Sequence, residues 1–432
     1  MKNKANPMAL LPIAVFLILY LGSGIYFEYI NPSEGQMGFY VMSVVVAFGL
    51  ALITAFAQNR TLSFDDKIRL CARGIGDDNI VIMLWIFLMA GAFSGIASTA
   101  GGAASASALM LEIIPAHFAV PGLFIIACLI SMAMGTSVGT ITVLVPIAVE
   151  MVQSTSFSLP FLVGTVVGGA MFGDNLSLIS DTTIAATRTQ GAKMHDKLRT
   201  NIRIALPAAL LTIAVLTIYT LHHPGAYQAA LSYDIRLALP YLIVLLLAFT
   251  GMNVFLVLGI GILLFLTAGL WAGTLTFAAA FAAMGDGTAG MYETIIVTIL
   301  VASISALMKA GGGFEAILQL IRNHTSDKRG GMAGICLLTA LMDVASANNT
   351  VAIVIAAPIA KEIAMEYDIS PARTASLLDT SSCIVQGIIP YGAQLLIASG
   401  LCGIPSMAII PFLYYPFFLA GCVMLSILMI KE

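Results

Sequence analysis

The sequence predicts an all-α polytopic membrane protein of about 10 to 12 membrane segments, built as two inverted-topology repeats with re-entrant hairpins and broken helices. Three observations lead to this prediction. Of the 432 residues, 59% are hydrophobic and only 9% are charged, which is typical of polytopic membrane proteins. Apolar runs long enough to span ~30 Å of hydrocarbon recur along the whole chain. The two halves also share a sequence pattern at a fixed offset.

The apolar runs define the expected segments and the domain organisation. They lie near residues 8–28, 37–58, 80–112, 121–151, 159–187, 203–222, 236–251, 252–272, 292–321, 331–364, 374–400 and 406–430. We interpret the first run as a retained transmembrane helix, because it is long for a signal peptide. The expected domains are an N-terminal helix in 1–36, a first repeat in 37–222, a connecting segment and helix in 223–248, and a second repeat in 249–432.

The repeat is recognised from a pattern shared by two of the long segments. The run Gly135–Ser137 leads to Pro146, and the run Ala347–Thr350 leads to Pro358, so that the two prolines define a constant offset between the halves. The same offset brings most other first-half segments onto second-half segments.

The basic residues indicate how the repeats are oriented. Lys and Arg cluster in the connections 59–79, which includes Arg60, 188–203 and 322–330, whereas the equivalent stretches 271–291 and 400–415 contain neither. The positive-inside rule makes the basic connections cytoplasmic, so the repeats are inverted. We expect a multi-pass protein of the cell inner membrane with a cytoplasmic N-terminus. Inverted repeats are typical of secondary transporters, whose sites lie at the repeat interface near the midplane.

The segments 121–151 and 331–364 are predicted to form re-entrant hairpins that enter from outside and from inside. Their tips would meet in mid-membrane, where non-helical backbone must be buried or line a watery cavity. The tips carry neutral oxygen donors that suit a hard monovalent cation: Thr136, Ser137, Asn348, Asn349 and Thr350. The alternative is that these side chains only hold helices together.

The polar run Gly173–Thr183 interrupts an apolar segment and contains two carboxylates. A carboxylate at this depth costs ~2.5 kcal/mol or more unless it is solvated, paired or bound to an ion. Asp174 and Asp181 would share one face of an unbroken helix. Asp181 lies nearer the cytoplasmic end, where a capping or snorkelling role is the alternative. Further candidates in this run, which could equally bond carbonyls one turn back, are Asn175, Ser177, Ser180 and Thr182.

The corresponding stretch of the second repeat, residues 386–394, contains Gly and Pro that would break a helix but no carboxylate. Its secondary candidates are Gln386 and Gln394, with Asp343 near the second tip. Asp379 is expected nearer a segment end. The six cysteines lack metal-ligand spacing, and no basic cluster suggests a nucleic-acid partner.

The pair Gly173-Asp174, followed by Ser180-Asp181-Thr182-Thr183, resembles the GD…SPLSDTT stretch of the NhaC family of sodium/proton antiporters, in the broader ion-transporter superfamily. Leu178 and Ile179 stand where Pro-Leu is common in that family. The resemblance implies cation/proton exchange. It leaves the cargo open, since similar members exchange malate for lactate or move amino acids.

The interpretation is therefore a secondary active transporter that exchanges cytoplasmic sodium for external protons by alternating access, with Asp174 shared by both ions. Sodium would be held at Asp174, Asn349 and Thr350. We expect no catalytic residue and no cofactor beyond the transported Na+ and H+. Expected partners are membrane lipid and a monovalent cation or small organic solute, and a homodimer is compatible with the sequence.

Two rival functions come from different classes. The close rival is a proton- or sodium-coupled carrier of organic anions or amino acids that uses the Asn348–Thr350 tip and helix N-termini to hold a carboxylate. The distant rival is an intramembrane enzyme with two membrane aspartates. Proteolysis does not need an inverted repeat, and the sequence contains neither an HExxH zinc motif nor a P-loop.

Overall fold

The computed structural model describes residues 5–31, 41–58, 62–113, 118–178, 180–223, 233–322 and 327–430. Arg60 and Ile179, which entered the sequence interpretation, lie outside the described residues. Within these ranges every regular element is a helix and no strand occurs, which confirms the all-α class.

The helices of the first half and of the connecting region follow the order predicted from the apolar runs, but several runs are split. Their bounds are α1 Leu11–Ile25, α2 Val44–Ala57, α3 Phe64–Ile75, α4 Asp78–Thr99, α5 Gly102–Ile113, α6 Ala119–Met134, α7 Ser137–Ser154, α8 Leu159–Leu176, α9 Asp181–Gln190, α10 Met194–His222 and α11 Ile235–Phe249. The 3-10 helix Pro7–Leu10 precedes α1 and the π-helix Tyr26–Ile30 follows it.

The second half repeats this succession as far as α19, and the span equivalent to α10 is divided into α20 and α21. Their bounds are α12 Val254–Ala272, α13 Phe277–Gly290, α14 Tyr292–Ala310, α15 Gly313–Arg322, α16 Lys328–Ser346, α17 Asn349–Glu366, α18 Pro371–Gln386, α19 Ala393–Cys402, α20 Ser406–Ile409 and α21 Tyr414–Leu428, with the 3-10 turn Ile410–Phe412 between the last two.

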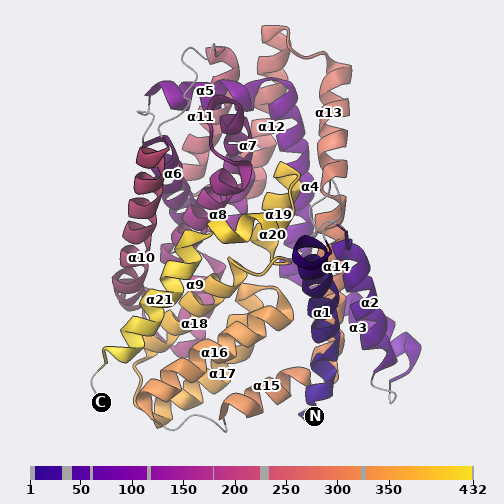
Figure 1. The fold of residues 1–432 in the computed structure, drawn as a ribbon, viewed down its shortest axis with the longest axis vertical. Coiled ribbons are helices and arrows are strands. Elements are labelled where there is room, and N and C mark those ends of the chain that lie inside the picture. Colours follow the sequence, from indigo (N-terminus) through magenta and orange to yellow (C-terminus); the bar gives the residue numbers. More distant parts are fainter. Residues whose placement is uncertain are drawn as a thin grey trace.

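The helix bounds recur at the offset found in the sequence. Shifted by the interval between Pro146 and Pro358, the bounds of α7 become those of α17, and the bounds of α9 become those of α19. Equivalent elements lie in opposite halves of the long axis: α5 at the top of Figure 1 and α15 at the bottom, α13 in the upper half and α3 in the lower half. This is the arrangement that inverted repeats require. The repeat boundaries at residues 37, 222 and 249 stay predictions.

Helices of each repeat pack on the other repeat. α3 packs on α14, and the equivalent pair α13 and α4 packs in the same way. Small residues allow the backbones to approach: a Cβ atom at Gly287 in α13 would overlap the Gly91 carbonyl oxygen of α4, and one at Gly74 in α3 would overlap the Ala302 carbonyl oxygen of α14. The two halves are therefore interlocked.

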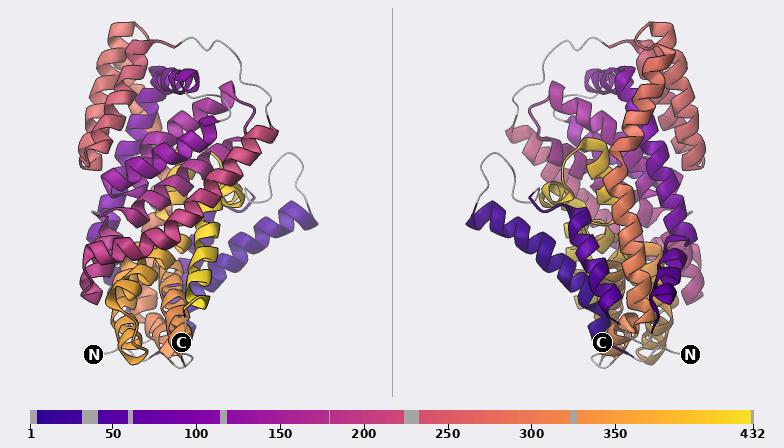
Figure 2. Two further views of the ribbon diagram at one scale, coloured as in Figure 1. Left: turned by 90° about the vertical axis from the view of Figure 1, so that its left-hand side faces the viewer. Right: turned by 90° about the vertical axis from the view of Figure 1, so that its right-hand side faces the viewer.

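The N-terminal helix α1, predicted as an extra element, packs on α2 as α11 packs on α12. Its Phe16 is buried and stacks on Phe48. The C-terminal end of α1, with the π-helix that follows it, projects obliquely from the other helices in the side views of Figure 2.

Among the described residues, seven helices are long and apolar enough to cross a membrane, or eight if the bent pair α19–α20 counts as one span. Four shorter apolar helices accompany them. Large apolar side chains remain exposed around the molecule, among them Leu246 and Leu263 at 65% and 62%, as a lipid-facing surface requires. The protein is an integral membrane protein.

Both predicted hairpins are present as helix pairs, α6–α7 and α16–α17. Each turns at a residue in the left-handed conformation, Gly135 (φ 69°) and Ala347 (φ 51°), followed by a side-chain cap from Thr136 or Asn348. The two spans that follow are broken, the first between α8 and α9 and the second between α18 and α19. These four interruptions meet at the centre of the molecule.

Candidate functional site

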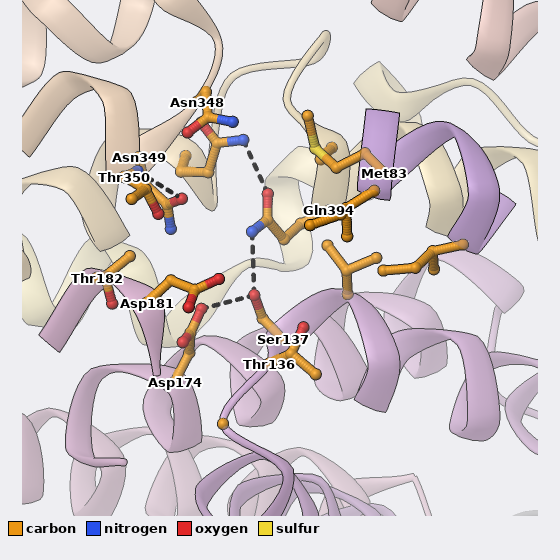
Figure 3. A pocket seen from close by; sticks show the side chains of 16 residues that line it. Met83, Thr136, Ser137, Asp174, Asp181, Thr182, Asn348, Asn349, Thr350 and Gln394 are labelled. Atoms are coloured by element: carbon orange, nitrogen blue, oxygen red, sulfur yellow. Dashed lines mark hydrogen bonds between the residues drawn. The ribbon is translucent and has the colours of Figure 1, made fainter. Parts of the chain in front are cut away.

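The two hairpin tips, both broken helices and part of α4 line one cavity of about 110 Å³. A cavity needs only ~10–15 Å³ on this measure to hold a water molecule, so there is room for several waters, an ion or a small solute. Of the residues singled out in the sequence, ten line it: Thr136, Ser137, Asp174, Asp181, Thr182, Asn348, Asn349, Thr350, Gln386 and Gln394. Figure 3 labels all of these residues except Gln386 and shows the labelled side chains converging from both repeats.

Asp174 lies in the last turn of α8 and is 5% exposed. Its Oδ2 accepts a hydrogen bond of 2.8 Å from Ser137 Oγ, at the first residue of α7. Ser137 Oγ in turn accepts from Gln394 Nε2 at 3.0 Å (Figure 3). The carboxylate of the first repeat is thus linked through one hydroxyl to an amide of the second repeat.

The chain of hydrogen bonds continues to Gln386, which occupies the position equivalent to Asp174 in the second repeat. In one amide orientation Gln386 Nε2 donates to Gln394 Oε1 at 2.9 Å. With the positions of its amide oxygen and nitrogen exchanged, Gln386 donates to Asp343 Oδ1 at 2.8 Å and accepts from the Ala393 N–H at 3.1 Å. Asp343 is fully buried in α16 and does not line the cavity. In either orientation the Gln386 amide lies between Gln394 of the cavity wall and the buried carboxyl group of Asp343.

Four helices begin at the cavity wall. Their first residues are Ser137 of α7, Asp181 of α9, Asn349 of α17 and Ala393 of α19, and all four line the cavity. Helix N-termini carry partial positive charge, which the carboxylates of Asp174 and Asp181 offset. The ends of α8 and α18 supply carbonyl groups of the opposite sign. The site can stabilise a cation beside an anionic group.

The chain is not one unbroken helix here, so the condition under which Asp174 and Asp181 would share a helix face is not met. α8 ends at Leu176 and α9 begins at Asp181, yet the break turns both carboxylates toward the same cavity. Asp181 is exposed and opens α9, where an acid is favoured by the helix dipole.

Three further candidates of this run lie behind the cavity wall. Ser177 Oγ donates to the Met132 carbonyl at 2.9 Å, and Ser180 Oγ caps α9 by accepting from the Thr183 N–H at 3.2 Å. Asn175 is buried and faces α10, where its carbonyl accepts from Lys197 Nζ at 2.9 Å. None of the three lines the cavity, so their placement favours structural roles.

Sequence reasoning missed a buried ion pair beside the site. Asp379, expected near a segment end, lies in the middle of α18, and its Oδ2 is 2.6 Å from Lys197 Nζ. Lys197, counted among the cytoplasmic basic residues, is 1% exposed because α10 begins at Met194, before the predicted segment. The spacing of Lys197 and Asn201 on one face of α10 is the signal that could have revealed them.

A second cavity of about 370 Å³ shares Asn348 with the first. Its lining includes Arg73, Asp77 and Lys309 beside apolar residues of α14 and α17. Asn348, whose Oδ1 accepts from the Val351 N–H at 3.0 Å, therefore stands between the central cavity and a vestibule of mixed charge.

Ser137 lies in a GxSxG pattern, Gly135–Gly139, which also occurs around nucleophilic serines. Its hydroxyl donates to a carboxylate, and no histidine occurs among the described residues that line the cavity. A serine nucleophile needs an adjacent base that takes its proton and is itself oriented. The geometry therefore gives no support to hydrolytic chemistry here.

The sequence model of the Na+/H+ antiporter family matches residues 3–222 and 226–431. This chain belongs to that family. It is thus a transporter of the antiporter class, and the family predicted from the Asp174–Asp181 motif is confirmed.

The names of similar proteins state different transported species. The Na+/H+ antiporter NhaC of Bacillus subtilis (strain 168) is 24% identical over 351 residues, 73% of this chain and 76% of the relative. The malate-2H+/Na+-lactate antiporter of the same organism is 20% identical over 344 residues, 71% of this chain and 73% of the relative. The arginine/ornithine antiporter ArcD of Halobacterium salinarum is 20% identical over 336 residues, 69% of each.

Among solved structures, the crystal structure of the Alcanivorax borkumensis YdaH transporter is 16% identical and covers 89% of this chain and 97% of its own, with a TM-score of 0.45. Because the relatives' names state different transported species, family membership leaves the species that this chain transports to be inferred from the site.

Proposed function

We propose that this antiporter exchanges cytoplasmic sodium for external protons by alternating access across the inner membrane, with its N-terminus in the cytoplasm. The observation that carries the proposal is the Asp174 carboxylate, which lines the central cavity at the end of a broken helix and is almost fully buried. Ionisable groups inside a membrane protein mark ion pathways and proton relays.

The proposed sodium ligands are Asp174, Asn349 and Thr350. They offer a carboxylate, an amide and a hydroxyl, the oxygen donors that hard cations prefer. α8 ends two residues after Asp174, so the negative end of its dipole adds to the attraction for a cation.

Coupling follows from the shared carboxylate. Protonation removes the charge that binds the cation, so a proton and a sodium ion compete for Asp174. If the cavity opens alternately to the two sides, each ion can move only when the other has left, which is exchange without hydrolysis.

The test uses purified protein in proteoliposomes loaded with a pH dye and challenged in turn with sodium, lithium, potassium, malate and amino acids. We expect sodium-dependent dye changes whose apparent sodium affinity weakens by up to about tenfold for each pH unit of acidification. Asp174→Asn should abolish exchange, because the amide keeps the shape but cannot ionise. Glu150→Gln is the matched control, since Glu150 is a membrane carboxylate in α7 that does not line the cavity.

A folded Asp174→Asn protein that exchanges sodium at the wild-type rate would refute the proposal.

A second candidate is sodium- or proton-coupled exchange of an organic carboxylate, favoured by the four helix N-termini at the cavity and by Arg73 and Lys309 in the vestibule. Dye changes that require malate or an amino acid, and that sodium alone does not elicit, would select this candidate.

A further inference from the structure

The buried ion pair of Lys197 and Asp379 joins elements of the two repeats directly behind the central cavity. Lys197 lies on α10 and Asp379 on α18, with 1% and 0% of their side chains exposed. Removing two charges from water costs free energy that a single pair seldom recovers. A contribution to stability therefore explains this ion pair poorly, and its position in the fold is the better guide to its role.

Lys197 holds both sides of the first helix break. Its Nζ donates to the Asn175 carbonyl at 2.9 Å and to Thr183 Oγ1 at 2.7 Å, in addition to its contact with Asp379. Asn175 follows Asp174 in the last turn of α8, where carbonyl groups lack helical donors, and Thr183 lies in the first turn of α9. One ammonium group thus bonds a carbonyl at the end of α8 and a side chain in the first turn of α9.

Asn201 reinforces the same connection one turn along α10. Its Nδ2 lies 3.1 Å from the Asn175 carbonyl oxygen, 2.9 Å from Asn175 Oδ1 and 2.9 Å from Asp379 Oδ2. Asn201 Oδ1 and Asp379 Oδ1 have no hydrogen-bond partner within the described part of the chain. One side chain of α10 thus bonds both the end of α8 and the middle of α18.

The cluster faces the site without lining it. Lys197, Asn201 and Asp379 are all absent from the cavity wall, but Lys197 and Asn201 bond the carbonyl of Asn175, the residue that follows Asp174. α18, which carries Asp379, ends at Gln386 in the cavity wall of the second repeat. The same three side chains therefore connect the broken helices of both repeats.

We propose that Lys197, Asn201 and Asp379 form a positioning clamp that fixes Asp174 for ion binding by holding the α8–α9 break against α18. The inference deepens the proposed sodium/proton exchange and rests on it. The clamp residues act through Asn175 and Thr183 and do not touch the transported ions. Loss of the clamp should therefore weaken sodium binding more than it slows turnover.

The decisive variant is the double substitution Lys197→Gln/Asp379→Asn, which leaves no unpaired charge in the core, whereas either single change would leave one. We expect the KM for sodium to rise by about tenfold or more, the scale of losing a charge-assisted hydrogen bond, with a smaller fall in kcat. The sodium-induced rise in melting temperature of the purified protein should shrink in parallel. Asn201→Ala, which introduces no charge, should raise the KM severalfold.

Lys67→Gln is the matched control. Lys67 is likewise buried and donates from Nζ to two backbone carbonyls, those of Phe56 and Gln58, but has no place near the cavity. The clamp proposal is refuted if the double variant and Asn201→Ala both keep the wild-type KM for sodium. It is also refuted if Lys67→Gln raises this KM as much as the double variant and Asn201→Ala do. If the double variant does not fold, Asn201→Ala alone decides. A wild-type protein without sodium-dependent exchange refutes the proposed function instead.

Discussion

Ser137→Ala probes the hydrogen bond on which the proposed competition between ions depends. The substitution removes the hydroxyl that donates to Asp174 Oδ2 at 2.8 Å and leaves the helix start at α7 otherwise intact. The ionised carboxylate loses more from this change than the protonated one, because hydrogen bonds to charged groups are the stronger class.

The size of the effect follows from the two classes of hydrogen bond. Bonds to charged groups contribute about 1.5–3 kcal/mol and neutral ones about 0.5–1.5 kcal/mol, so the difference is roughly 1–1.5 kcal/mol, a factor of about 5 to 13. The sodium-bound and the empty ionised states lose the same strong bond, whereas the protonated state loses only a weaker one. The KM for sodium should therefore rise by this factor at acidic pH and return to the wild-type value at alkaline pH.

The assay is the sodium titration of dye-loaded proteoliposomes at several pH values. Ser131→Ala is the matched control, because Ser131 is also buried and donates from Oγ to the Ala170 carbonyl at 2.6 Å, with no carboxylate involved. An equal rise in KM at every pH would mean that Ser137 contacts sodium directly, and no rise at acidic pH would refute the reasoning.

Three further predictions concern the tips and the packing of the repeats. Asn349→Ala should raise the KM for the transported species in the liposome assay without loss of folded protein. Unchanged kinetics would mean that the Asn348–Thr350 tip only packs against its neighbouring helices. Ala347→Gly should relieve the left-handed strain (φ 51°) and stabilise the protein by up to about 1 kcal/mol, seen as a small rise in melting temperature, whereas Gly135→Ala should lower it; equal melting temperatures would contradict this. Gly287→Val should lower the melting temperature and the yield of folded protein, because its side chain would overlap the Gly91 carbonyl; a wild-type yield would show that α13 can shift.

The hairpins were predictable because their signals are local. Small and polar residues at Gly135–Ser137 and Ala347–Asn349 interrupt apolar runs, and the matching prolines fix the offset between the repeats. Local signals also located the polar run that contains Asp174 and Asp181. They did not show that the helix is interrupted there rather than continuous, since Ser and Thr occur within helices as well as at caps.

The ion pair escaped prediction because it depends on which way a helix faces. Lys197 lies in a stretch rich in basic residues, so its charge was assigned to the cytoplasmic surface. In the structure Lys197, Asn201 and Ala208 share the buried face of α10. Asp379 lies in the other half of the chain, and no local pattern connects it with Lys197.

The cross-packing of the repeats has a consequence for how the protein is made. Gly91 and Gly287 meet at a backbone contact although they belong to opposite halves of the chain. At a synthesis rate of about 5–20 residues per second, α4 waits roughly 10–40 s in the bilayer before α13 leaves the ribosome. During this interval the small-residue face of α4 is open to lipid or to another nascent chain. Biogenesis of this protein therefore depends on delayed assembly within the membrane, and neither half of the chain is a self-sufficient folding unit.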